Sequence, residues 1–235
     1  MNVLLLGVNG DIGNSIFKKI YSNKNTYFLT FSKKKPNFKK KNIKYIKIDF
    51  SKKTDINKQI KFLNKFNFSI VINNVGDSNP YKDFIRLSEN DIQKSFDINF
   101  FSPFKIIFSI LKKNIKIKKK LNIINISSNT VKFQGSKKNF PYFISKSTLE
   151  TTLKFLSDKF SKNKVRINII RPGLIKVKKT TKLLKYSRKN FNLRESMIPT
   201  GNAGHPEDIS NLVKFLSEEK SKYIYGQVIS VSGGE

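Results

Sequence analysis

Short apolar runs alternate with longer amphipathic stretches along the chain, and this alternation indicates an α/β protein. The apolar runs have the length and composition of buried strands, and we expect strands at residues 2–7, 26–32, 44–50, 69–73, 122–127, 166–170 and 227–231. Apolar positions recur every three or four residues between them, which predicts helices over residues 12–21, 56–66, 92–112, 142–160 and 206–217. Parallel neighbours need such crossover connections. We therefore predict a doubly wound, seven-stranded, mostly parallel sheet with helices on both faces.

The length of the chain fits one domain of this kind. A chain of 235 residues with 38% hydrophobic content can bury one core and still carry a ligand cleft. We expect a single-domain Rossmann fold over residues 1–235. Residues 33–41 and 176–204 do not fit the alternation of strands and helices. The second segment is long enough to form a lid over a substrate.

Composition removes several classes of function. The chain has no cysteine and a single histidine, His205, so neither a disulfide framework nor a zinc site is expected, and we predict no metal. No stretch approaches the ~20 apolar residues of a membrane helix, and the first residues lack a basic leader. We therefore expect a cytoplasmic protein with no membrane partner.

The net charge of +31 is the one feature that suggests a polyanionic partner. However, lysines are spread along the whole chain, and the scarcity of alanine together with abundant Asn, Ile and Phe is the pattern that an A/T-rich coding sequence imposes. We interpret the charge as a solvated basic surface and expect no specific nucleic acid partner. A nucleic-acid-binding protein would instead show affinity that falls steeply with salt and ignores sequence.

A glycine-rich turn follows the first expected strand and opens the first expected helix. Glycines let the backbone approach a pyrophosphate closely, and the helix N-terminus offers that anion unpaired N–H groups and a partial positive charge. Such turns also occur without a ligand, so the rest of the chain has to agree. The expected pyrophosphate contacts are Gly7, Asn9, Gly10, Asp11, Ile12 and Gly13.

The residues after the second expected strand bear on the choice of dinucleotide. An acidic side chain there would bind the ribose 2′-hydroxyl of NAD, whereas basic residues suit the 2′-phosphate of NADP. Ser32 and Lys33 stand at this point and favour NADP(H), with NAD(H) as the alternative.

Tyr142 and Lys146 begin a predicted helix and carry candidate acid–base chemistry. Four residues separate them, so the two side chains share one helical face. A tyrosine with a pKa of ~10 is a weak acid at neutral pH, and a nearby ammonium lowers that pKa toward the working range. The spacing alone is common on helix surfaces, so the surrounding motifs decide its meaning.

Those motifs resemble the short-chain dehydrogenase/reductase family over essentially the whole chain, and particularly its 3-oxoacyl-(acyl-carrier-protein) reductases. The resemblance rests on the ordered set of the glycine turn, Asp49, Asn73-Asn74-Val75-Gly76, Asn99, Ser128, Tyr142 with Lys146, and Arg171-Pro172-Gly173. It implies an NAD(P)-dependent oxidoreductase that transfers hydride between the nicotinamide and a carbonyl or secondary alcohol.

The resemblance also implies roles for four catalytic residues. Tyr142 is expected to protonate the carbonyl oxygen, while Lys146 lowers the pKa of Tyr142 and holds the nicotinamide ribose. Ser128 is expected to polarise the carbonyl in preference to its neighbour Ser127. Asn99 is expected to anchor a water that links Lys146 to solvent.

The remaining implied contacts belong to the cofactor. Asp49 is expected to receive the adenine amino group with Phe50 beside it. The further binding residues implied are Asn73, Asn74 and Gly76 toward the adenosine, and Pro172, Gly173 and Ile175 along the nicotinamide. One departure concerns Asp11, which stands where the family usually has glycine and puts the local pyrophosphate contact in question.

Two other functions remain to be weighed. Gly7, Gly10 and Gly13 also resemble the sugar-nucleotide-modifying branch of the superfamily, but that branch needs further C-terminal residues to build a substrate domain. A non-catalytic dinucleotide-binding regulator would keep the glycine turn, yet it would have no reason to keep serine, tyrosine, lysine and asparagine in register.

Substrate and assembly are the least determined features. The segment 176–204 mixes basic and apolar residues, which suits an acyl chain on an acidic carrier, a phosphorylated sugar or an uncharged substrate. Lys162 and Lys164 fall where related reductases place basic residues for their carrier. A small-molecule carbonyl substrate remains open. By the same resemblance we expect a homodimer or homotetramer that packs the helices carrying Asn99 and Tyr142.

Overall fold

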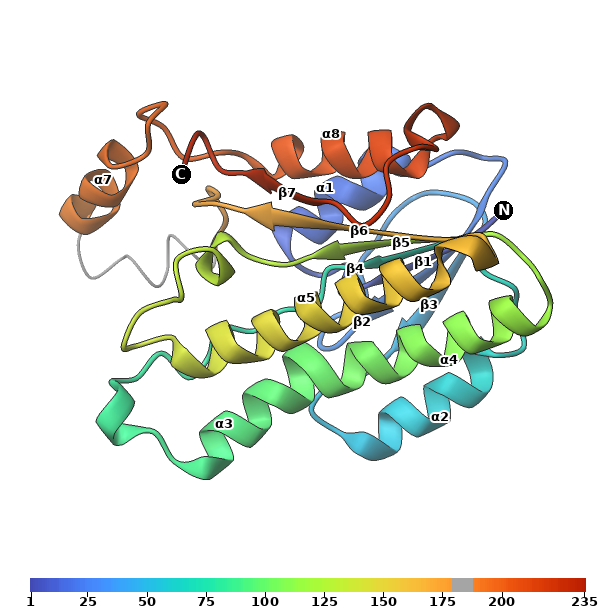
Figure 1. Ribbon diagram of the computed structural model, residues 1–235, viewed down its shortest axis with the longest axis horizontal. Coiled ribbons are helices and arrows are strands. Elements are labelled where there is room, and N and C mark those ends of the chain that lie inside the picture. The colour runs from blue at the N-terminus through green and yellow to red at the C-terminus, as the bar shows by residue number, and fades with distance from the viewer. Residues whose placement is uncertain (179–187) are drawn as a thin grey trace.

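The computed structural model describes residues 1–178 and 188–235, and its centre is one all-parallel sheet (Figure 1). The strand order is β3-β2-β1-β4-β5-β6-β7. The strands are β1 (Asn2–Leu6), β2 (Thr26–Phe31), β3 (Ile43–Lys47), β4 (Ile70–Asn73), β5 (Leu121–Ile126), β6 (Val165–Pro172) and β7 (Val228–Val231). The predicted doubly wound, seven-stranded α/β fold is therefore confirmed.

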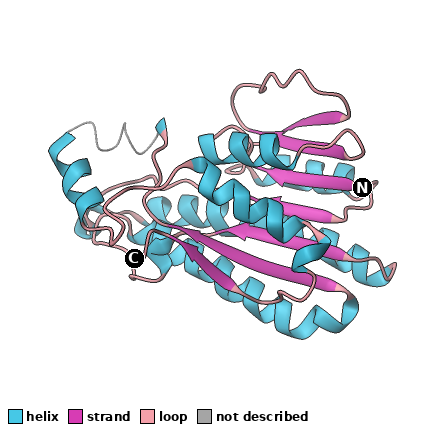
Figure 2. Ribbon diagram, turned by 90° about the horizontal axis from the view of Figure 1, so that it is seen from above, coloured by secondary structure: helices cyan, strands magenta, loops and turns pink. Residues whose placement is uncertain are grey.

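Helices cover both faces of this sheet (Figures 1 and 2). The helices are α1 (Asp11–Ile20), α2 (Lys53–Leu63), α3 (Glu89–Phe96), α4 (Ser102–Lys116), α5 (Phe140–Phe160), α7 (Arg188–Ser196) and α8 (Pro206–Ser217). Helices α1 and α8 pack together on one face, whereas α2, α4 and α5 lie on the other. Within the described part of the chain, no helix is long and apolar enough to cross a membrane.

The two faces of β1 show how the strands build two cores. Leu4 and Leu6 belong to the core under α4 and α5, while Val3 and Leu5 belong to the core under α1 and α8. All four side chains are buried. A strand covered on both faces has no polar side, which explains why the strands read as continuous apolar runs in the sequence. Burying each such side chain stabilises the fold by about 1.5–3 kcal/mol.

The predicted helix over residues 92–112 is interrupted in the structure. Helix α3 leads into a π-helical turn, η2 (Asp97–Phe101), before α4 begins. Pro103, in the first turn of α4, has no N–H, and its ring would clash with the carbonyl of Asn99 in a regular α-helix. The wider turn relieves this clash.

The expected lid segment contains a helix in its described part. Ile175 and Gly204 form an isolated parallel bridge that closes the base of the segment. Lys176 pairs with Glu195 of α7 at 2.8 Å, and Arg194 pairs with Glu235 at the end of the chain. These contacts hold α7 beside the carboxyl ends of the strands. Lys182 and Lys185, which contribute to the basic character of the segment, lie outside the described residues.

Candidate active site

A cleft of about 850 Å³ opens at the carboxyl ends of the strands. It crosses the point between β1 and β4 where the strand order reverses, which is where open α/β sheets bind ligands. Its volume falls within the range of about 300–1,000 Å³ that is usual for ligand pockets. The predicted site residues that line it are Gly7, Asn9, Gly10, Asp11, Ile12, Ser32, Lys33, Asp49, Phe50, Asn74, Gly76, Ser128, Tyr142, Lys146, Pro172, Gly173 and Ile175.

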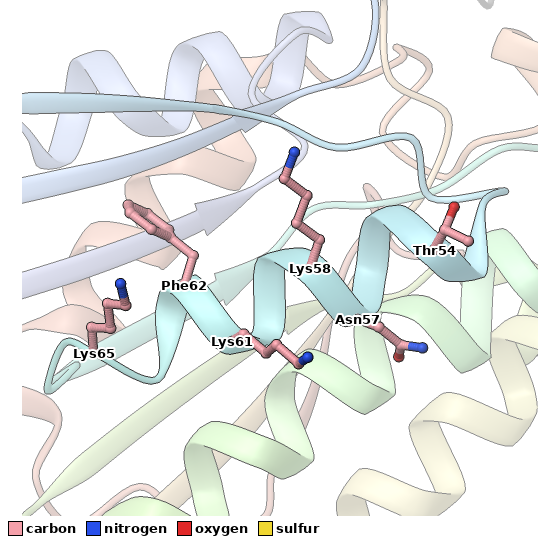
Figure 3. Close-up of a pocket in the computed structure, with 6 residues that line it drawn as sticks. All are labelled: Thr54, Asn57, Lys58, Lys61, Phe62 and Lys65. Atoms are coloured by element: carbon pink, nitrogen blue, oxygen red, sulfur yellow. The ribbon is translucent and has the colours of Figure 1, made fainter.

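A second hollow, of about 540 Å³, lies on the outer side of α2 (Figure 3). Its lining comes from one helix and the turn after it, and shares no residue with the cleft. Lys58, Lys61, Phe62 and Lys65 are among its lining residues. These side chains present a basic surface with one aromatic ring.

The glycine turn has the geometry that an anion site requires. Gly7 adopts a φ of +80°, and its N–H donates to Thr30 Oγ1 at 2.9 Å. A Cβ on Gly13 would lie 2.4 Å from the Gly7 carbonyl oxygen, whereas a Cβ on Gly10 would meet nothing within 4 Å. Helix α1 begins after Gly10 with no side-chain cap, so its first N–H groups face open space. A dinucleotide pyrophosphate fits this arrangement.

Two asparagines brace the rim of the same turn. Asn9 accepts from the Ser32 N–H at 3.1 Å and donates to the Lys34 carbonyl at 2.7 Å, while Asn74 donates to the Gly7 carbonyl at 2.8 Å. The segment that carries Ser32 and Lys33 is therefore tied directly to the phosphate turn.

Asp49 lies farther along the cleft, on the adenosine side of the predicted site. Its carboxylate accepts from the Ser51 hydroxyl at 2.6 Å and from the Ser51 N–H at 3.0 Å. These hydrogen bonds, opposed by partial burial and aided by Lys52 and Lys94, lower the pKa of Asp49. The carboxylate is thus ionised at neutral pH and can accept from an amino group.

Lys146 lies at the centre of the catalytic end. Its side chain is buried, and its ammonium donates to the carbonyls of Val75 at 2.8 Å and Ile126 at 2.9 Å. The Nζ atom lies 5.9 Å from the centroid of the Tyr142 ring. Burial lowers the pKa of Lys146 to about 8, against the opposing effect of the Glu150 carboxylate. Tyrosine and lysine therefore share one face of α5, as the spacing predicts.

The acidity of Tyr142 differs from the expectation. Burial raises the pKa of Tyr142, the nearby charge of Asp77 acts in the same direction, and a hydrogen bond with Ser128 only partly offsets them. The net lowering expected from Lys146 is absent from this structure. The reason is that burial, which disfavours the charged phenolate, outweighs the effect of Ser128 on the phenol. The phenol therefore remains protonated at neutral pH.

The two serines after β5 have different partners. Ser127 is buried and donates its hydroxyl to Glu150 at 2.8 Å. The Ser128 hydroxyl donates to Thr130 Oγ1 at 3.0 Å and accepts from the Thr130 N–H at 3.2 Å, and it lies close enough to Tyr142 to lower the pKa of that phenol. A hydroxyl committed to a buried carboxylate cannot polarise a substrate, so the geometry favours Ser128.

Three of the predicted residues lie behind the wall of the cleft. Gly13 allows the close packing of the glycine turn described above. Asn73 is fully buried and donates to Asn125 Oδ1 at 2.7 Å, which corrects the expectation that it lines the adenosine side. Asn99 is also fully buried, and its amide accepts from the Asp77 N–H at 2.8 Å and donates to the Asp77 carbonyl at 3.0 Å. These residues shape the cleft from beneath.

Several lining residues were missed by sequence reasoning. They are Ser51, Asp77, Asn79, Lys94, Ile98, Ile126 and Leu174. Most of them immediately follow a strand, so their position at strand ends was an available signal. Lys94 and Ile98 project from α3 and η2, and their arrival at the cleft depends on helix packing that the sequence pattern does not give.

Comparison with known proteins agrees with this geometry. A family model described as enoyl-(acyl carrier protein) reductase matches residues 30–235. The chain is 31% identical over 235 residues to the 3-oxoacyl-(acyl-carrier-protein) reductase FabG of Chlamydia muridarum, covering 99% of this chain and 86% of that protein. The chain belongs to the short-chain dehydrogenase/reductase family. It is accordingly an NAD(P)-binding oxidoreductase of that family.

Solved structures show that the fold of this family is shared along the whole chain. A 2-deoxy-D-gluconate 3-dehydrogenase-like protein from Agrobacterium tumefaciens with bound NADP superimposes with a TM-score of 0.86 at 23% identity, covering 99% of this chain and 95% of that one. A 4-hydroxyisoleucine dehydrogenase complexed with NADH gives a TM-score of 0.87 at 24% identity, covering 99% and 97%. The short-chain dehydrogenase/reductase fold thus accepts either dinucleotide.

Proposed function

We propose that the protein is an NADP(H)-dependent carbonyl reductase in which Ser128, Tyr142 and Lys146 carry the proton chemistry. The single observation that supports this most directly is the meeting of these three side chains at the carboxyl end of β5, inside a cleft that begins at an uncapped helix N-terminus. A non-catalytic dinucleotide-binding regulator would need the helix N-terminus, but it would have no use for the three side chains.

The proposed roles follow from the contacts. The bound dinucleotide supplies the hydride. Ser128 holds the carbonyl oxygen beside the Tyr142 hydroxyl, and the raised pKa of Tyr142 keeps the phenolic proton in place until negative charge develops on that oxygen. Tyr142 then donates its proton, and the Lys146 ammonium stabilises the phenolate that remains. Asn99 fixes the Asp77 backbone beside this group, and the water that links Lys146 to solvent is proposed to bind at Asn99.

The preference for NADP(H) rests on the segment after β2. Ser32 and Lys33 line the cleft and are held against the glycine turn by Asn9. Residues 31–35 contain no carboxylate that would select the ribose 2′-hydroxyl of NAD. The Agrobacterium tumefaciens neighbour binds NADP, and the 4-hydroxyisoleucine dehydrogenase binds NADH. NAD(H) is therefore the second candidate.

The substrate that we propose is a 3-oxoacyl thioester. Large apolar side chains are exposed on three segments around the catalytic end, namely the β4–α3 connection, the β5–α5 connection and α7: Tyr81, Phe84, Ile85, Phe133, Leu193 and Met197. An apolar rim of this kind suits an acyl chain better than a sugar. The FabG relative carries the name of such an activity.

A substrate linked to a carrier protein would need carrier contacts from a second copy of the chain. Lys162 and Lys164 lie between the end of α5 and the start of β6, at the amino-terminal edge of the sheet. The cleft opens at the opposite edge. Carrier docking through these two lysines is therefore proposed only in an assembly that brings a second copy near the cleft.

Partly buried aromatic residues of η2 and α4, together with one exposed aromatic residue of α5, support such an assembly. Phe100, Phe104 and Phe108 stack along one line, with ring centroids 5.4 and 5.3 Å apart. Phe155 on α5 is 59% exposed. Apolar surface on these two neighbouring helices supports the expected homodimer or homotetramer.

The test is NADPH oxidation, followed by absorbance with NADH in parallel, against free and carrier-bound 3-oxoacyl thioesters, simple ketones and keto-sugars. Tyr142→Phe should abolish turnover while leaving NADPH affinity within about threefold, because only the ionisable oxygen is lost. Ser128→Ala should lose most of the rate. Binding of NADPH without turnover of any substrate would favour the regulator, and absence of dinucleotide binding would refute the proposal.

A further inference from the structure

Three consecutive residues at the end of β5 each contact one residue of α5. Ser128 interacts with the Tyr142 phenol, the Ile126 carbonyl accepts from Lys146 at 2.9 Å, and the Ser127 hydroxyl donates to Glu150 at 2.8 Å. The three α5 residues are spaced by four, so they form one line along the helix face that packs on the strand. Tyr142 and Lys146 are thus two members of a row that has a third.

The third member is a buried carboxylate with a full set of partners. The Glu150 side chain is almost completely buried, and besides Ser127 it accepts from Arg171 Nε at 3.1 Å and from Arg171 Nη2. Arg171 comes from β6, where the preceding residue, Ile170, pairs with Ile126 of β5. The ion pair therefore ties α5 to the two strands whose ends form the catalytic side of the cleft.

A buried ion pair is energetically less favourable than apolar side chains as a way to fill a core. Removing two charges from water carries a desolvation penalty, and apolar residues of similar volume often stabilise a protein as well or better. Its presence directly below the catalytic lysine therefore calls for a role other than packing.

The electrostatic surroundings of Lys146 supply that role. The ionisable groups around it are Tyr142 and Glu150 on α5, Asp77 on the β4–α3 connection, and Arg171 on β6 through its pair with Glu150. Burial pushes the pKa of Lys146 down, and Glu150 is the group that opposes this. Without the carboxylate, a larger fraction of Lys146 would be neutral near pH 8.

We propose that the Glu150–Arg171 ion pair is a positioning element that acts through Lys146, in which Glu150 sets the charge of Lys146 and Arg171 sets the strength of that effect. The proposal rests on the proposed function of Tyr142 and Lys146. It assigns neither residue a contact with the substrate or the dinucleotide.

The experiment compares the pH dependence of kcat in Glu150→Gln and Arg171→Gln. Loss of the carboxylate should move the basic limb of the profile to lower pH by on the order of one unit, because Lys146 then loses its proton more easily. Loss of the guanidinium leaves Glu150 uncompensated, so the same limb should move to higher pH. A pair that serves only packing would move both profiles in one direction or neither, and that result overturns the proposal.

Two further variants separate the effect of a substitution on stability from its effect on the charge of Lys146. Glu218→Gln makes the same chemical change at an exposed pair on α8 and should leave the profile where it is. Glu150→Leu/Arg171→Met replaces the whole pair with apolar volume, so it should unfold near the wild-type temperature. Its basic limb should nevertheless remain below that of the wild type. This double variant carries the test if the single variants fail to fold.

A titration that needs no turnover distinguishes this proposal from the proposed function. Carbon-13 labelling at lysine Cε, with Lys146→Arg used to assign the signal, reports the protonation midpoint of Lys146 directly. The midpoint should fall in Glu150→Gln and rise in Arg171→Gln. A protonation midpoint of Lys146 that is unchanged in both variants overturns this inference, even if the enzyme is active. If the midpoint shifts as predicted but the protein turns over no carbonyl, the effect of Glu150 on Lys146 is upheld and the proposed function fails.

Discussion

The glycine turn allows a direct test of the cofactor site, because one of its glycines is tightly packed and another borders open space. At Gly13 an added Cβ would lie 2.4 Å from the Gly7 carbonyl oxygen and 3.0 Å from Val8 Cα, and both neighbours are backbone atoms. At Gly10 an added Cβ would meet no atom within 4 Å. We therefore expect Gly13→Ala to damage both folding and binding, and Gly10→Ala to damage mainly binding.

The magnitude for Gly13→Ala follows from two opposing effects. Overpacking against a backbone that cannot yield costs up to about 3 kcal/mol, and the better helix propensity of alanine returns about 1 kcal/mol. The net loss of about 2 kcal/mol corresponds to a fall in Tm of about 4–8 °C for a chain of this size.

Gly10→Ala loses only part of an N-cap preference, about 0.5 kcal/mol, but its methyl group occupies the open space above the helix N-terminus. Its NADPH affinity should fall by about tenfold or more, because the close approach of the pyrophosphate is blocked. Calorimetric unfolding and a fluorescence titration with NADPH measure the two effects separately. A Gly13→Ala protein that unfolds at the wild-type temperature, or a Gly10→Ala protein that binds NADPH normally, would refute the reasoning.

Four further predictions concern charge and assembly. Asp11→Asn should tighten NADPH binding by about three- to tenfold, since it removes a negative charge beside the pyrophosphate site; isothermal titration at low salt measures this. Lys33→Asp should weaken NADPH at least tenfold and leave NADH nearly unchanged in the same titration. Ser51→Ala should raise the pKa of Asp49 in the folded protein. In urea unfolding, the variant should therefore be less stable than the wild type at pH 7, which is above the pKa of Asp49 in the unfolded chain. This difference in stability should vanish as the pH falls through the lowered pKa of Asp49 in the folded wild type. Phe155→Lys should shift the mass from light scattering toward the monomer, and a monomeric wild type would contradict the proposed assembly.

The sequence by itself determined the order and kind of the elements. Central parallel strands are buried on both faces, so β1, β4 and β5 are mostly apolar, and the helices between them show their own period. The glycine turn and the spacing of Tyr142 and Lys146 are local features, because each depends on backbone geometry within a few residues. The fold could be predicted correctly for that reason, and the same local features are what allowed these site residues to be proposed.

Only the tertiary structure decided which side chains meet and which are shielded from water. Asn73 and Asn99 occur in recognisable motifs, yet both lie beneath the cleft, and Glu150 gains its importance from Arg171, a residue on β6. The direction of the Tyr142 pKa shift likewise depends on burial and on Asp77, which no local spacing reveals. Burial and long-range pairing are set by the order of strands in the sheet and by the packing of α5 upon it, so they become visible only when distant segments are brought together.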